Sequence, residues 1–302
     1  ARDWAGAAHR RLPFVLMLMS TPQILLRRPH RLGAMDRNLR LLLARVERAC
    51  VIRNEMWQVA AEHIKSNPIE RRIEQHGQQH TVYLHAPCPF PDNLSVMFGE
   101  WLYLLRSALD GLMYELVVHD TQLDPPRNAR RIYYPINATA DNFAQKANTE
   151  GLRERTRLAI EATQPYHSTG GHTGSALWWI HELARIDRHR RGHTLTWRIV
   201  DMNFYFASDL VDRHSVRICD QFSAIVRDDK ELEIVSFCAK GLTKSQSNDG
   251  VDIRWRVEFD VPDWLDKIPT SYAQWGMDDR MANAELVVGK TIEYFDEFIQ
   301  DS

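Results

Sequence analysis

A dense run of basic and acidic side chains occupies residues 182–193, which read E-L-A-R-I-D-R-H-R-R-G-H. It follows an apolar stretch, and the spacing predicts a helix with one buried face formed by Ala176, Leu177, Ile180, Leu183 and Ala184. Gly192 favours the end of that helix, with His193 at or just past it. The run uses arginine and histidine where a solvated face would use lysine and glutamate. These residue types suit phosphate binding and proton transfer.

The spacing of Arg188 and His193 fits an Arg-x4-His pattern. In such a pair the arginine holds a phosphate and its developing charge, while the histidine moves a proton to or from a ribose oxygen. The 2′-hydroxyl of RNA supplies the nucleophile, so we expect no metal and no cofactor. The expected catalytic set is Arg188, His193, His189 and Arg185, with Asp187 and Glu182 in support.

Two other interpretations of the same residues remain open. Glu182, His189 and His193 fall on one helical face in acceptable metal-ligand geometry, which would suit a metal-dependent hydrolase. The neighbouring arginines would repel a dication, so anion chemistry is favoured. Alternatively, the basic helix end stabilises the helix dipole and pairs with nearby carboxylates, in a protein that interacts without catalysis.

A second candidate pair, Arg106 and Asp110, lies one helical turn apart on a helix that is apolar on its other faces. The pair is either an internal salt bridge or the second half of the polar site. A buried guanidinium needs acceptors for all its donors. We therefore predict that this helix packs beside the helix of residues 182–193, with at least one contact between them and with Asp187 as the preferred partner of Arg106.

The elements that must position these residues change in kind along the chain. Hydrophobic periodicity predicts helices over residues 36–66, 94–118, 141–146 and 152–162, with a strand or hairpin at 72–75 and 81–84. Period-two patterns then predict strands over 194–206, 214–227, 231–239 and 251–261, before a final helix at 280–299. This order predicts an α+β fold, with an N-terminal helical bundle followed by an antiparallel sheet and a C-terminal helix. Residues 35–193 and 194–302 form two parts of one domain or two domains, and we expect 1–34 to be upstream or unstructured.

Composition limits the classes of function. The 302 residues are 44% hydrophobic and 26% charged, with a net charge of −2, so any nucleic-acid binding must come from local clustering. The four cysteines form no C-x-x-C pair, which favours a reduced, cytoplasmic protein. No apolar run reaches the roughly 18 residues that span a bilayer, so no membrane partner is expected.

Two motifs in this chain resemble those of an uncharacterised bacterial family. Its members carry a helix reading LRSALDHL and a later segment reading HELxxID(K/R)HR, which match residues 105–110 and 181–190 here. The chain departs from the first motif at Gly111, where the family places histidine.

The chain also resembles, more loosely, the HEPN domains, helical bundles whose ribonucleases use Arg-x4-6-His in dimers with a composite site. The resemblance implies that Arg188 and His193 are the motif, whereas Arg106 lacks a histidine partner. We therefore expect a HEPN-like, metal-independent ribonuclease or RNA-binding protein in a toxin or phage-defence setting, with RNA as its partner and a homodimer as its assembly.

Overall fold

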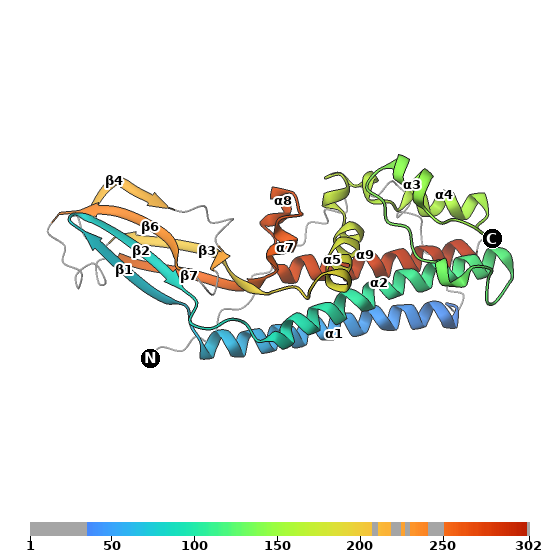
Figure 1. Ribbon diagram of the computed structural model, residues 1–302, viewed down its shortest axis with the longest axis horizontal. Helices are drawn as coiled ribbons and strands as arrows, with labels where there is room; N and C mark the ends of the chain where they lie inside the picture. Colours follow the sequence, from blue (N-terminus) through green and yellow to red (C-terminus); the bar gives the residue numbers. More distant parts are fainter. Residues whose placement is uncertain (1–34, 207–210, 219–224, 227–229, 241–250, 301–302) are drawn as a thin grey trace.

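Three long helices run side by side along the long axis of the molecule, and the strands gather at one end (Figure 1). They are α1 (Arg37–Ser66), α2 (Asp92–Thr121) and α9 (Met277–Gln300). The computed structural model describes residues 35–206, 211–218, 225–226, 230–240 and 251–300. Our expectation for residues 1–34 lies outside this part of the chain.

Local sequence explains where α1 begins and ends. Asp36 caps its N-terminus, since its side chain accepts a hydrogen bond from the Asn38 backbone N–H at 2.7 Å. Asn67 and Pro68 follow the last turn, and proline disfavours helical backbone in the residue before it. The buried side chains recur at three- and four-residue steps: Leu39, Leu42, Val46, Ala49, Ile52, Met56 and Ala60.

Shorter helices cover the bundle. Helix α5 (Ala176–His189) packs against both α2 and α9. The remaining helical segments are α3 (Ala140–Lys146), α4 (Glu154–Ala162), α7 (Pro262–Leu265), α8 (Thr270–Ala273) and the 3-10 turns η2 (Ala129–Arg131), η3 (Pro165–His167) and η4 (His172–Gly174).

The strands form two antiparallel sheets at one end of the long helices (Figure 1). Their strands are β1 (Glu70–His76), β2 (Gln79–His85), β3 (Thr196–Phe206), β4 (Val211–Ile218), β5 (Ile225–Val226), β6 (Leu232–Ala239) and β7 (Val251–Asp260). One sheet has the order β1-β2-β6-β4 and the other β5-β3-β7. The early hairpin therefore joins strands from the second half of the chain, because β2 pairs with β6 along its length.

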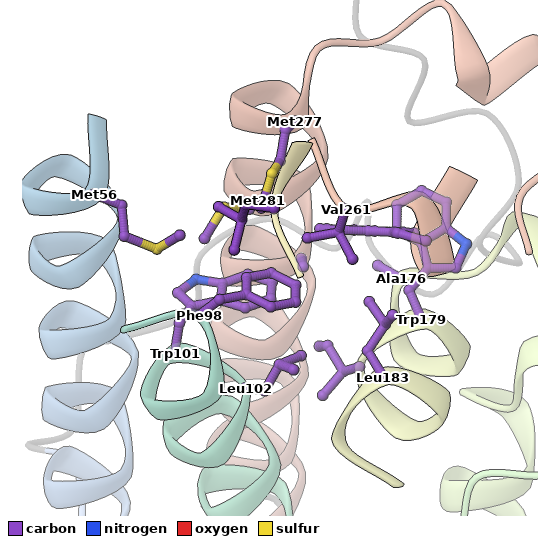
Figure 2. Packing of buried hydrophobic residues seen from close by; sticks show 14 of the residues in the cluster. Met56, Phe98, Trp101, Leu102, Ala176, Trp179, Leu183, Val261, Met277 and Met281 are labelled. Atoms are coloured by element: carbon purple, nitrogen blue, oxygen red, sulfur yellow. The ribbon is translucent and has the colours of Figure 1, made fainter. Parts of the chain in front are cut away.

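The α+β class is thus confirmed, and elements from both sides of the boundary expected near residue 194 pack together. Helix α9 returns to pack on α1 and α2, while the β1–β2 hairpin belongs to a sheet. A continuous core joins the parts where Phe98 and Trp101 of α2 meet Trp179 of α5 and Met281 of α9 (Figure 2).

A buried group of ion pairs connects the β5-β3-β7 sheet to the helical bundle. Asp260, at the end of β7, accepts from Arg198 Nη1 of β3 at 2.8 Å and from Arg280 Nη2 of α9 at 2.6 Å. The Arg280 guanidinium also lies over the ring of Trp264, 4.6 Å from its centroid, which is a cation–π contact. Charges this deeply buried are tolerated because each has an opposite partner.

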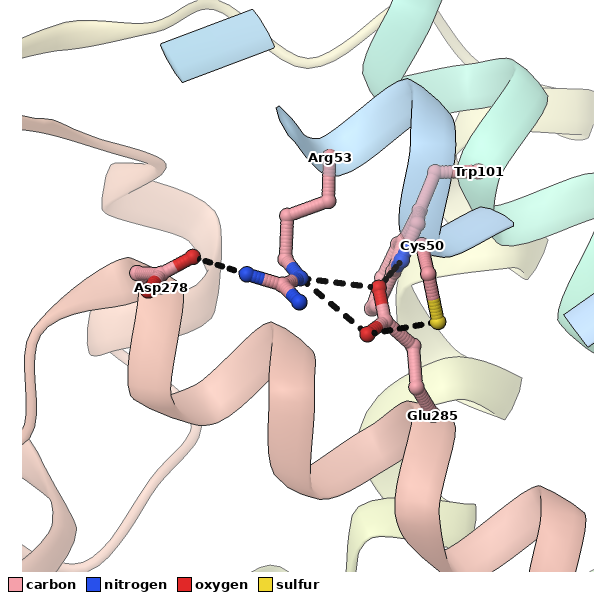
Figure 3. A network of polar contacts seen from close by, with 5 residues as sticks. All are labelled: Cys50, Arg53, Trp101, Asp278 and Glu285. Atoms are coloured by element: carbon pink, nitrogen blue, oxygen red, sulfur yellow. Dashed lines mark hydrogen bonds and ion pairs between the residues drawn. The ribbon is translucent and has the colours of Figure 1, made fainter. Parts of the chain in front are cut away.

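A second polar network holds the three long helices together (Figure 3). Glu285 of α9 is only 5% exposed. Its carboxylate accepts from Arg53 Nε at 3.0 Å, from Trp101 Nε1 at 2.9 Å and from Cys50 Sγ at 3.1 Å. Asp278 pairs with the other side of the Arg53 guanidinium. One carboxylate therefore links α1, α2 and α9.

Candidate functional site

The predicted buried face of α5 is confirmed. All five side chains expected there are buried, and the opposite side carries the polar residues. The helix ends at His189, earlier than Gly192 suggests, and the Arg190 backbone N–H closes it by donating to the Ile186 carbonyl at 2.9 Å. Consequently Arg188, His189, Arg190 and Arg191 stand together, exposed, at and just past the helix end.

The Arg106–Asp110 pair is a real ion pair inside the protein. Arg106 is 5% exposed, and its Nη2 lies 2.9 Å from Asp110 Oδ1. Both residues also hold the segment that follows η2, because Arg106 Nη2 donates to the Tyr134 carbonyl at 2.7 Å and Asp110 Oδ1 accepts from the Tyr134 N–H at 2.9 Å. Burial lowers the pKa of Arg106, which Asp110 counteracts, and burial raises the pKa of Asp110.

Helices α2 and α5 pack side by side, as the two polar motifs predicted. The Asp187 carboxylate lies against Gly99 of α2, where a Cβ atom would stand 3.1 Å from Asp187 Oδ2. Arg106, Asp110, Asp187 and Arg188 all line one small pocket at this seam. The acceptors of Arg106 are nevertheless Asp110 and Tyr134 rather than Asp187, so our preferred partner was wrong.

His193 is not where an acid–base catalyst must be. Its side chain is 0% exposed, and it packs edge-on against Phe98 with ring centroids 5.4 Å apart. Both ring nitrogens have protein partners: Nε2 lies 2.9 Å from the Leu183 carbonyl oxygen and Nδ1 lies 3.1 Å from Asp263 Oδ2. Since no ring nitrogen is open to a substrate, the direct catalytic role predicted for His193 is corrected to a structural one.

The alternative metal site is also not assembled. Glu182 is engaged by Arg185, whose Nη2 and Nε lie 2.8 and 3.2 Å from its two oxygens, and both nitrogens of His193 are occupied. Within the described ranges, no group of three or more His, Cys, Asp or Glu side chains is placed to hold a metal ion. His189 is exposed at the end of α5, beside Arg188.

A larger pocket lies between the end of α5 and α7. Its volume is about 260 Å³, and it is lined by Ile186, Arg190, Arg191, Asp263, Asp266 and Lys267. The lining combines three cationic side chains with two carboxylates, and one of these, Asp263, is the partner of His193. Sequence reasoning missed Lys267, because it is distant in sequence from the basic run.

His181 is a second residue that sequence reasoning left out, although it lies in the HELxxID motif. Burial and the nearby positive charge of Arg106 lower the pKa of His181 to about 4. Its imidazole is therefore neutral at pH 7. The seam between α2 and α5 thus combines two arginines, two aspartates and a neutral histidine.

Gly111, where the chain departs from the LRSALDHL motif, has a packing reason. A Cβ atom at this position would lie 2.6 Å from Leu42 Cδ2 of α1. A histidine could not enter here unless the Leu42 side chain moved. Arg106 therefore has no histidine partner five residues later, and Leu42 of α1 fills the space beside Gly111.

Comparisons of the chain with protein-family models, with curated proteins and with solved structures gave no match. The resemblances noted from the sequence therefore remain predictions. In the part of the chain that the structure describes, no helix combines the length and the apolar character needed to cross a bilayer.

Proposed function

We propose that this protein binds RNA through the basic end of α5. The observation that carries the proposal is the exposed run Arg188, His189, Arg190 and Arg191. None of the four forms an ion pair with a carboxylate among the described residues, whereas the neighbouring Arg185 is paired with Glu182. Unpaired arginines are suited to phosphate oxygens, because the guanidinium fork matches their geometry.

The larger pocket supports the same proposal. Arg190, Arg191 and Lys267 extend the positive surface from α5 towards α7, beside a cavity that a nucleotide's phosphate and sugar could enter. The protein as a whole has a net charge of −2, so attraction of a polyanion depends on this local cluster. The bundle is compatible with the HEPN-like interpretation, in which the motif-bearing helix meets RNA.

A ribonuclease form of this proposal needs an imidazole at the surface. His189 is exposed beside Arg188, so it is the candidate acid–base residue in place of the buried His193. If the protein cleaves RNA in EDTA, His189→Ala should lower the rate by about 10²–10⁴-fold, the usual contribution of general acid–base catalysis. RNA binding should be nearly unchanged. Cleavage that is unaffected by His189→Ala would exclude this form.

The binding proposal is tested by fluorescence anisotropy with a single-stranded RNA over a range of salt concentrations. The double variant Arg190→Gln/Arg191→Gln should weaken binding and reduce the slope of log K against log salt by about 1.4, since each phosphate contact on a single strand contributes about 0.7. Arg213→Gln/Arg217→Gln, which removes two exposed arginines from β4, is the charge-matched control and should change neither value. Equal effects of the two changes would leave only non-specific attraction and would refute the proposal.

A further inference from the structure

The small pocket at the seam of α2 and α5 has the size of one compact polar group. Its volume is about 50 Å³. One water-sized sphere requires roughly 10–15 Å³, so the pocket accommodates about three to five oxygen-sized atoms. Its charged lining consists of Arg106 and Asp110 from α2 and of Asp187 and Arg188 from α5.

Arg106, which lines this pocket, carries an unsatisfied donor. Its Nη2 serves Tyr134 and Asp110, but its Nη1 is buried and has no hydrogen-bond partner among the described residues. A buried donor without an acceptor is unfavourable, and a guanidinium can only donate. A ligand oxygen in the pocket would supply the missing acceptor.

Arg188 adds a second cation on the opposite wall. Its Nε donates to the Ala184 carbonyl at 3.1 Å, which directs the side chain back along α5. Its charge is close enough to Arg106 to add to the lowering of the pKa of that guanidinium by burial. Two like charges across a small pocket repel each other, and an anion between them would relieve the repulsion.

The carboxylates restrict which anion fits. Asp110 is already occupied by Arg106 and by the Tyr134 N–H. Asp187 has no hydrogen bond or ion pair within the described part of the chain, and it can only accept. The ligand must therefore present acceptors to two arginines and one donor to an aspartate, within the volume of a few atoms.

We propose that this pocket binds a phosphate group that carries a proton, as inorganic phosphate or as the terminal monoester of a nucleotide or RNA. The phosphate oxygens accept from Arg106 and Arg188, and the P–OH group donates to Asp187. A phosphate monoester has a second pKa near 6, so the protonated form is abundant in weakly acidic solution. Sulfate and the internal phosphodiesters of RNA have no such proton and would face Asp187 as anion against anion. Binding of a terminal RNA phosphate rests on the proposed function, whereas binding of inorganic phosphate does not.

Isothermal titration calorimetry of the full chain at pH 6 tests the site, with inorganic phosphate and sulfate as probes. We expect phosphate to bind at least about tenfold more tightly than sulfate, because one charge-assisted hydrogen bond is gained and one repulsion is avoided. Arg188→Gln should weaken phosphate binding at least about tenfold, and as an exposed residue it should not disturb folding. Arg213→Gln, an exposed arginine on β4 that lines neither pocket, is the matched control and should leave the phosphate affinity unchanged.

Asp187→Asn is the diagnostic variant. An asparagine removes the negative charge and can donate as well as accept, so the preference for phosphate over sulfate should fall to about one. The proposal is overturned if the wild-type chain binds no phosphate at millimolar concentration, or if it binds sulfate equally well.

The two sources of phosphate are separated with a short RNA bearing either a 5′-phosphate or a 5′-hydroxyl. If the end is the ligand, the 5′-phosphate RNA binds more tightly and Asp187→Asn removes that advantage. Inorganic phosphate that competes with neither RNA assigns the site to free phosphate. RNA binding that depends on Arg190 and Arg191, with no phosphate binding in the calorimeter, would refute this site and leave the proposed function standing.

Discussion

Glu285 offers the sharpest test of how the bundle is held together. Its carboxylate accepts hydrogen bonds from donors on both α1 and α2. Glu285→Ala therefore removes a negative charge and leaves these donors without their acceptor. Trp101 is 0% exposed, and its Nε1–H has no other acceptor among the described residues. Arg53 loses its more buried partner but keeps Asp278.

The expected cost follows from these contacts. An unsatisfied buried donor costs about 1–3 kcal/mol, and removing one member of a buried ion pair costs about 3–5 kcal/mol. Asp278 still neutralises Arg53, so the two costs should not add in full. We expect the free energy of unfolding to fall by about 3–5 kcal/mol in total. At roughly 2–4 °C per kcal/mol, the melting temperature should fall by about 6–20 °C.

Urea denaturation followed by circular dichroism measures this loss directly. The matched control is Glu293→Ala, a half-exposed glutamate on the same helix that pairs with Lys290, where a surface ion pair contributes about 0–1 kcal/mol. A double-mutant cycle with Arg53→Met should give a coupling energy of about 0.5–3 kcal/mol. A loss for Glu285→Ala no larger than for Glu293→Ala would refute the reasoning that one buried carboxylate links the three helices.

Three further predictions concern single side chains. Gly111→Ala should destabilise the fold by about 1–3 kcal/mol by overpacking against Leu42, and Leu42→Ala should offset part of this loss. Gly289 of α9 has open space around it, so Gly289→Ala should stabilise the fold by about 0.5–1 kcal/mol in the same denaturation assay. The Cys50 thiol should react with iodoacetamide at least about tenfold more slowly than an ordinary thiol, because burial and Glu285 raise its pKa from 9.0 to about 12. Peptide mass spectrometry measures the rate, and a normal rate would contradict this. The pKa of His181 is about 4 in the folded state and about 6.5 in the unfolded state, so the unfolded state binds the proton first as the pH falls. The free energy of unfolding should therefore fall by about 2 kcal/mol between pH 7 and pH 5. His181→Gln should remove this part of the pH dependence.

Much of this architecture is readable from the sequence because it depends on local periodicity. The apolar spacing in α1 and α5 dictates which faces are buried, and the alternation in β3 and β7 dictates two strands. The packing of α2 on α5 was also predictable. Each of these largely apolar helices carries a polar motif, and charged side chains that become buried need polar partners on a neighbouring element.

The roles of individual polar residues depended on tertiary structure instead. An Arg-x4-His spacing states how far apart two residues are along the chain, but it does not state which side chain is covered by another element. Here α5 ends at His189, and the chain then turns His193 inward against Phe98 and Asp263, while Arg188 stays at the surface. Burial by a distant helix is a non-local property, so the spacing alone could not assign a catalyst.

The same reason applies to the buried charges. The sequence marks Glu285 as one more carboxylate on a C-terminal helix, and it gives no sign that donors from α1 and α2 converge on it. It likewise predicts that Arg106 needs acceptors but not that Tyr134 would supply one from a loop. Chemistry and periodicity are carried by neighbours in sequence, whereas the partner that satisfies a buried charge is chosen by which elements the core brings into contact.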